Sequence, residues 1–211
     1  MSETVHCITT GRWRQNGYVV EGAGGAALVI DPGAEPERYM ELLRARKLTP
    51  AAILNTHAHY DHIGGIDGLI KAYAGLPFYL HGADQALLRQ ANVYRSIFGS
   101  SEKIVVPDDF IDLRGAGGRL DLGEFSVGIL ATPGHTNGGV CFVIESNLFT
   151  GDTLLPSGVG RTDLPGGSPL KIAQSMKMLE QLSGDLQMHP GHGPVVRLAD
   201  ALAHNTSHPA A

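Results

Sequence analysis

The chain has 211 residues, of which 43% are hydrophobic, and its formal net charge is -5 at pH 7. This length is enough to bury a large core, and the mild acidity gives no reason to expect nucleic acid or an anionic membrane as a partner. No apolar run reaches the roughly 18 residues of a membrane-spanning helix, and residues 1–4 lack the features of a signal peptide. Cys7 and Cys141 are expected to be buried reduced thiols. We therefore expect one domain, residues 1–211, in the cytoplasm.

The first half of the chain predicts several strands with helices between them. Apolar or alternating runs predict strands over residues 5–9, 17–21 and 26–31, with a hairpin turn at residues 22–25. Pro36 is expected to open a helix whose apolar stripe includes Tyr39 and Leu43. Later segments predict strands over residues 51–55 and 77–81, helices over residues 66–73 and 83–91, and irregular chain over residues 92–107.

The second half contains more predicted strands than helices. Strands are expected near residues 110–113, 125–131, 140–145 and 147–150. Ser168 and Pro169 predict the start of a helix whose apolar stripe contains Ile172, Met176 and Leu179. Residues 200–211 have the composition of a polar tail, which we expect to be disordered or weakly docked. The chain is thus interpreted as two half-sandwiches without an obvious linker.

Four potential metal ligands lie in one short loop directly after the predicted strand at residues 51–55. The run Thr56-His57-Ala58-His59-Tyr60-Asp61-His62 contains the pattern HxHxDH. Two histidines at positions i and i+2 of an extended backbone project to the same side, so both imidazoles can reach one metal. A turn beginning at Asp61 would direct Asp61 and His62 toward a second site. Polar side chains at this density indicate metal binding or catalysis rather than a solvated loop.

Three later turns offer further ligands, each directly after a strand-like run. His135 lies in Thr132-Pro133-Gly134-His135-Thr136, Asp152 lies in Phe149-Thr150-Gly151-Asp152-Thr153, and His192 lies between two glycines. A lone His or Asp in a turn more often caps or hydrogen-bonds the backbone. However, α/β proteins gather functional loops at strand ends. Together with the HxHxDH loop, these three residues predict a complete metal centre.

From residue 16 to residue 194, the chain resembles the metallo-β-lactamase superfamily of hydrolases, with Asp31 in Val29-Ile30-Asp31-Pro32-Gly33 preceding the ligands in the family's order. The resemblance implies a four-layer αββα sandwich, an α/β fold with the metals at one edge between the sheets. It also implies that His57, His59 and His135 hold the first metal. Asp61, His62 and His192 would hold the second metal, and Asp152 would bridge the two. The implied cofactors are two divalent metal ions, zinc first, with iron or manganese as alternatives.

Within the superfamily, the segments around Asp152 and His192 look most like the short single-domain members of the glyoxalase II (hydroxyacylglutathione hydrolase) group. The matching segments are residues 151–155, Gly160-Arg161-Thr162-Asp163-Leu164-Pro165-Gly166-Gly167, and residues 189–194. The likeness implies a thioesterase acting on S-lactoylglutathione or a related small acyl thioester. Longer members hold glutathione with a C-terminal helical domain, for which the stretch after Pro194 is too short. A glutathione site would then come from residues 92–107 or from a second subunit.

The ligand set also predicts the chemistry. Two divalent metals bridged by Asp152 and a water would lower the pKa of that water toward about 7 and supply hydroxide at neutral pH. The metals would also polarise a carbonyl and stabilise the oxyanion. Asp61 is the catalytic candidate, because a ligand there can also orient the hydroxide and receive its proton. Thiolate leaves without a strong general acid, which permits a thioester without selecting it over a lactone or an amide.

Two other activities stay open on this fold. A mononuclear iron persulfide dioxygenase would use His57, His135 and Asp152, a set of two histidines and one carboxylate. The presence of the second-site ligands favours hydrolysis over this alternative. A lactonase or a β-lactamase would keep the metals and change the substrate. In each case the expected partner is a small molecule, with no nucleic acid and no membrane, and the oligomeric state is left open.

Three residues near the predicted ligands have two interpretations each. Asp31 either orients a ligand as a hydrogen-bond acceptor or caps the turn that follows it. Tyr60 either lines the pocket or packs in the core. Arg161 forms a charged pair with Asp163, with contact to an anionic substrate as the alternative. His189 is interpreted as an ordinary histidine and not as a ligand.

Overall fold

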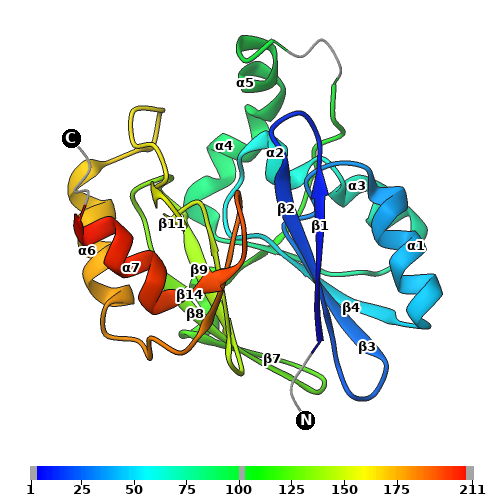
Figure 1. The fold of residues 1–211 in the computed structure, drawn as a ribbon. Helices are drawn as coiled ribbons and strands as arrows, with labels where there is room; N and C mark the ends of the chain where they lie inside the picture. Colours follow the sequence, from blue (N-terminus) through cyan, green and yellow to red (C-terminus); the bar gives the residue numbers. More distant parts are fainter. Residues whose placement is uncertain (1–3, 100–102, 208–211) are drawn as a thin grey trace.

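The computed structural model describes residues 4–99 and 103–207, which form two facing six-stranded sheets (Figure 1). In neighbour order, the first sheet contains β1 (Thr4–Thr10), β2 (Gln15–Glu21), β3 (Ala26–Ile30), β4 (Thr49–Leu54), β5 (Phe78–Leu80) and β6 (Ile111–Asp112). The second contains β14 (Val196–Arg197), β13 (Gln187–Pro190), β10 (Asn147–Gly151), β9 (Val140–Ile144), β8 (Phe125–Ala131) and β7 (Arg119–Leu122). A separate short pair is formed by β11 (Leu154–Leu155) and β12 (Gly158–Val159).

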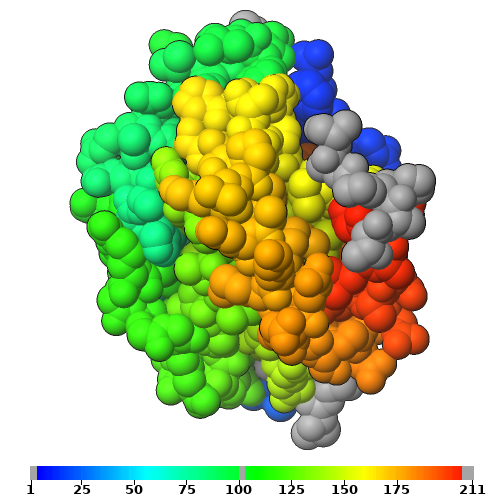
Figure 2. Space-filling model, turned by 90° about the vertical axis from the view of Figure 1, so that its left-hand side faces the viewer, coloured from blue at the N-terminus to red at the C-terminus, as the bar shows by residue number. Residues whose placement is uncertain are grey.

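Helices cover the outer face of each sheet. The side of the first sheet carries α1 (Pro36–Arg46), α2 (Tyr60–Ile63), α3 (Ile66–Ala72), the 3-10 turn η1 (Gly82–Asp84), α4 (Gln85–Arg89) and α5 (Ala91–Ile97). A second 3-10 turn, η2 (Leu113–Ala116), follows β6. The second sheet is covered by α6 (Pro169–Leu179) and α7 (Leu198–Ser207). Figure 2 shows α6 in orange at the surface beside α7 in red. The predicted αββα sandwich is confirmed.

Side-chain alternation in the strands explains the layers. In β3, Val29 faces the core under the helices, whereas Leu28 and Ile30 face the core between the sheets. In β9, Phe142 faces the same central core and Cys141 faces the core under α6 and α7. Successive side chains of a strand point to opposite faces, and here both faces are buried. Such strands are therefore expected to be almost continuously apolar.

Three expected segments differ from the structure. The predicted helix over residues 83–91 is divided between η1 and α4, and the segment expected to be irregular, residues 92–107, begins inside helix α5. The expected polar tail is wrong for residues 200–207, which belong to α7. Leu198 and Ala201 are buried, and Leu202 packs on the same cluster. These positions repeat at helical spacing, i, i+3 and i+4. Residues 208–211 lie outside the described part of the chain.

Two smaller expectations concern the cysteines and the membrane. Both cysteines are free, but only Cys141 is buried, whereas Cys7 is exposed on the edge strand β1. Across residues 4–99 and 103–207, no helix combines the length and the apolar character needed to cross a membrane.

Candidate metal centre

The predicted ligands come together where strands end in loops, at one end of the two sheets. His57 and His59 follow β4, His135 follows β8, and Asp152 and His192 follow β10 and β13. His59 is still extended, and α2 begins at the next residue. This change of backbone direction brings Asp61 and His62 to His192, although the ring of His62 stays 4.1 Å from the ring of His57 between their centroids. The ligand atoms of each triad, His57 with His59 and His135, and Asp61 with His62 and His192, lie within 4.8 Å of one another.

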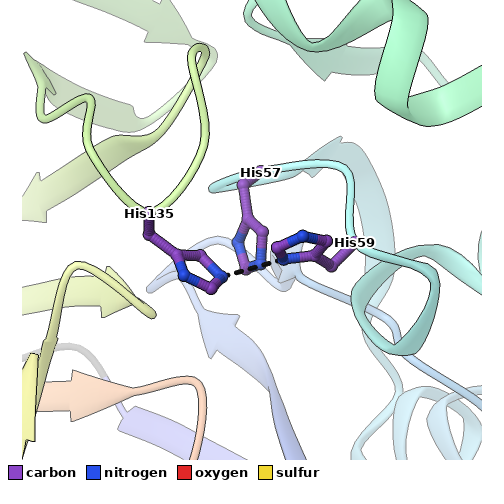
Figure 3. Close-up of side chains that lie close together, drawn as sticks. All are labelled: His57, His59 and His135. Atoms are coloured by element: carbon purple, nitrogen blue, oxygen red, sulfur yellow. Dashed lines mark hydrogen bonds between the residues drawn. The ribbon is translucent and has the colours of Figure 1, made fainter. Parts of the chain in front are cut away.

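The three histidines of the first triad converge on one point (Figure 3). Nε2 of His135 lies 2.8 Å from Nδ1 of His59, and the ring centroids of His57 and His135 are 4.9 Å apart. Burial and the neighbouring histidines hold the pKa of His57 well below its ordinary value and lower the pKa of His59 to about 3. Both rings are therefore neutral, which leaves a lone pair on each for a metal.

Asp152 lies between the two triads. Its Oδ1 is 3.6 Å from Nε2 of His62, and its Oδ2 is 3.6 Å from Nε2 of both His135 and His192. In the second triad, Nε2 of His192 is 3.3 Å from Oδ2 of Asp61. One carboxylate thus lies 3.6 Å from histidines of both triads. Gly191 makes room for it, because a Cβ there would collide with Oδ1 of Asp152 and with His62.

The polar atoms at the centre fit a cation. Among the described residues, Nε2 of His57, Nε2 of His62 and Oδ1 of Asp152 are buried without a hydrogen-bond partner, although buried polar atoms are almost always paired. Burial alone would lower the pKa of His62, but Asp152, Asp61 and Asp31 outweigh it and raise that pKa to about 9. The carboxylates therefore create a negative potential at this point. Imidazole nitrogens and carboxylate oxygens suit zinc, iron and manganese.

Asp31 orients two of the ligand rings. Its Oδ2 accepts hydrogen bonds from Nδ1 of His62 at 2.9 Å and from the hydroxyl of Thr56 at 2.5 Å. The Thr56 hydroxyl in turn lies 3.0 Å from Nδ1 of His57. Both rings therefore turn Nε2 toward the centre. Of the two interpretations of Asp31, the structure supports the acceptor that orients ligands, a role that strengthens metal binding.

Backbone carbonyls orient two more rings. Nδ1 of His135 donates to the carbonyl of Arg161 at 2.8 Å, and Nδ1 of His192 donates to the carbonyl of Trp13 at 3.1 Å. The sequence gives no sign of either bond, because any residue type supplies a carbonyl. His189 does not join the centre: its Nε2 lies 2.9 Å from Oδ1 of Asn147. The interpretation of His189 as an ordinary histidine agrees with this contact.

Asp84, which sequence reasoning missed, connects the two halves of the site. Its Oδ2 accepts from the backbone N–H of Ala58 at 3.1 Å and from the hydroxyl of Thr136 at 2.8 Å. Its Oδ1 accepts from the backbone N–H of Gly138 at 2.6 Å. One buried carboxylate thus fixes the loop of His57 and His59 to the loop of His135. The only sign of this role in the sequence is an aspartate within the largely apolar segment between residues 76 and 91.

A cavity of about 300 Å³ opens over the centre. His59, Asp61, His135, Asp152 and His192 form its floor, and its walls are Trp13, Tyr60, Phe98, Arg161 and Leu164. Tyr60 fits both of its interpretations, because it lines the cavity and stacks on Phe98 with 6.1 Å between ring centroids. Arg161 forms the predicted pair with Asp163 through two bonds of 2.8 and 2.7 Å. A small molecule therefore has access to the predicted ligands.

Comparison with known proteins places this site in a family. The model of the metallo-beta-lactamase superfamily matches residues 10–196. A probable metallo-hydrolase of Bacillus subtilis is 35% identical over 171 residues, which cover 79% of this chain and 80% of that protein. A hydroxyacylglutathione hydrolase of Anaeromyxobacter dehalogenans is 36% identical over 183 residues, which cover 86% of this chain and 63% of that protein.

Solved structures agree with the sequence comparison. The BLEG-1 B3 metallo-β-lactamase has a TM-score of 0.89 and 31% identity, covering 98% of this chain and 100% of that one. TTHA1623, solved in a di-iron-bound form, has a TM-score of 0.83 and 37% identity, covering 92% of this chain and 96% of that one. With its fold, its histidine and aspartate clusters and these matches, the chain belongs to the metallo-β-lactamase superfamily of metal-dependent hydrolases.

Proposed function

We propose that this protein is a binuclear metallohydrolase that cleaves S-lactoylglutathione or a related small acyl thioester. The observation that supports the proposal most is the pair of ligand triads with Asp152 between them. A mononuclear iron dioxygenase has no need of Asp61, His62 and His192. We propose zinc as the first candidate metal, and the di-iron form of one relative supports iron as the alternative.

The residues of the centre have two proposed roles, which are metal binding and proton transfer. His57, His59 and His135 would hold one metal, Asp61, His62 and His192 the other, and Asp152 would touch both. When bound, such ions supply an activated water and polarise a carbonyl. Asp61 is half-buried and its carboxylate lies on the cavity floor. In this position Asp61 is able to orient a water and to accept its proton.

The substrate class is supported by one relative and by the shape of the cavity. The relative from Anaeromyxobacter dehalogenans is called a hydroxyacylglutathione hydrolase. The cavity places the apolar side chains of Trp13, Phe98 and Leu164 around the floor of ligands, and such walls suit a short acyl group. A thiolate also leaves without a strong general acid, so the site needs no further proton donor.

Side-by-side kinetics test the proposal. We would measure kcat/KM on metal-loaded protein for S-lactoylglutathione, a penicillin and an acyl-homoserine lactone, together with oxygen uptake on glutathione persulfide. The thioester is expected to be the best substrate. A lactone or lactam preferred by more than about tenfold, roughly 1.4 kcal/mol of transition-state discrimination, would overturn the assignment. Oxygen uptake faster than all three hydrolyses would replace it with the dioxygenase.

A substitution of Asp61 tests the second triad. Asp61→Ala is expected to lower kcat for the thioester by about 100-fold or more, as is typical when a general acid or base is removed. The fold should persist, since the Asp61 side chain lines the cavity and is not part of a hydrophobic core cluster. Asp121→Ala, in the exposed pair with Arg119, is the matched control and should keep full turnover. Wild-type turnover in Asp61→Ala would rule out the role of Asp61.

A further inference from the structure

A second cavity adjoins the one over the metal centre. Its volume is about 540 Å³, and Trp13, Tyr60, Asp61 and Phe98 line both cavities. The two cavities therefore share a wall beside the predicted ligands. A volume of this size is typical of sites that hold small molecules. The chemistry proposed above uses only the first cavity, which leaves the second without a role.

The second cavity is lined by three cationic side chains. Arg12 lies in the loop between β1 and β2, Arg95 lies in α5, and Lys103 lies beyond that helix. Tyr60, which lies between the ligands His59 and Asp61, lines the same cavity as these cationic side chains. The lining also contains three carboxylates, those of Glu35, Asp61 and Asp67, of which Asp61 belongs to the metal centre.

The other acidic residues of the lining have cationic or amide partners of their own. Glu35 accepts from the backbone N–H of Gly11 at 3.1 Å and lies 3.4 Å from the guanidinium of Arg38. Asp67 pairs with Lys71 at 2.8 Å. Neither Arg38 nor Lys71 lines the cavity. The positive charge of the lining is therefore not cancelled by these two carboxylates.

Two contacts place the exposed side chain of Arg12 beside Trp13 and Phe98. Its guanidinium lies 5.2 Å from the centroid of the Trp13 ring, and it donates to the carbonyl of Phe98 at 3.5 Å. Stacking of this kind leaves edges of a guanidinium available to a carboxylate. The rings of Trp13 and Phe98 add an apolar surface between the metal centre and the cationic groups.

We propose that the second cavity binds a carboxylate-bearing thiol portion of the substrate, with Arg12 and Lys103 as recognition groups. This inference rests on the proposed thioesterase and narrows its substrate class to thioesters with an anionic leaving thiol. The smaller acyl half occupies the 300 Å³ cavity over the centre, and the bulkier thiol half extends past Trp13 into the larger one. Binding of the distal carboxylates then positions the scissile carbonyl over the ligands.

The test compares two substrates with the same thioester group, one with free carboxylates on its thiol portion and one with these carboxylates esterified. S-lactoylglutathione carries two carboxylates, and its diethyl ester carries none. We expect wild-type protein to prefer the acid, and the double variant Arg12→Gln/Lys103→Gln to lower the ratio of kcat/KM for acid over ester by about tenfold, through KM. Added salt should lower the same ratio in wild-type protein. Arg119→Gln removes an exposed charge on β7, outside the cavity lining, and should leave the ratio unchanged.

The outcomes distinguish a failure of the proposed subsite from a failure of the proposed thioesterase activity. Equal kcat/KM for acid and ester in wild-type protein, or an unchanged ratio in the double variant, would overturn the subsite and leave the thioesterase standing. If neither thioester is hydrolysed, the proposed function fails, and glutathione binding then tests the subsite alone. Trp13 is the single tryptophan, so its fluorescence reports on binding. Quenching that the double variant loses would support the subsite, and absent or unchanged quenching would overturn it.

Discussion

Removal of the Asp84 carboxylate is expected to destabilise the protein and to loosen the metal centre. Asp84→Ala leaves three donors without their acceptor: the N–H groups of Ala58 and Gly138 and the hydroxyl of Thr136. A buried donor without a partner costs about 1–3 kcal/mol. Burial also raises the pKa of Asp84, which shows that the carboxylate is itself costly to bury and offsets part of the loss. We therefore expect about 3 kcal/mol of destabilisation.

Thermal unfolding and metal titration measure the two effects. For a chain of this size, about 3 kcal/mol corresponds to a fall in Tm of roughly 6–12 °C. Metal affinity should fall as well, because the loop of His57 and His59 is no longer fixed to the loop of His135. Asp121→Ala, an exposed control, should change stability by less than about 0.5 kcal/mol. The reasoning would be refuted if Asp84→Ala lost less than about 1 kcal/mol and kept wild-type metal affinity.

Three further results are expected. Asp31→Ala should weaken metal binding about 10–100-fold in a chelator competition, because His62 loses its acceptor; wild-type affinity would contradict this role. Burial lowers the pKa of His189 from 6.5 to about 4. Between these two pH values the histidine is protonated in the unfolded chain but neutral in the folded protein. The free energy of unfolding should therefore fall by up to about 3 kcal/mol as the pH drops from 6.5 toward 4. Urea unfolding of His189→Gln should lack this part of the pH dependence, and an identical profile would contradict it. Removal of metal by a chelator should lower the free energy of unfolding by about 4 kcal/mol if the metal was present at about 1,000 times its Kd, and an unchanged unfolding curve would speak against a metal-stabilised fold.

The sequence predicts this site well where the signal is local. The HxHxDH pattern places four side chains in one short segment, and the backbone change from extended His59 to helix α2 brings Asp61 and His62 to His192. Strands were found because both of their faces are buried, which leaves long apolar runs. Helix α7 was missed because the sequence His204-Asn205-Thr206-Ser207 makes its second half polar, whereas the apolar stripe of Leu198 and Ala201 occupies only its first half.

Contacts between segments that are distant in the sequence could not be predicted. Asp84 meets donors 26 and 54 residues away, at Ala58 and Gly138. The carbonyl of Trp13 accepts from His192 across 179 residues. No local pattern reports such pairs, and a carbonyl is present at every residue. The lining of the second cavity could not be predicted for the same reason, because Arg12, Arg95 and Lys103 come from separate elements.

The metal content of the purified protein tests the two-metal centre most directly. Protein prepared without chelator, loaded with zinc or iron and dialysed, would be analysed by plasma mass spectrometry. Two metal ions per chain are expected for the wild type, and close to one for His192→Ala, which removes a ligand of the second triad only. One iron ion per wild-type chain, unchanged in His192→Ala, would contradict the binuclear hydrolase.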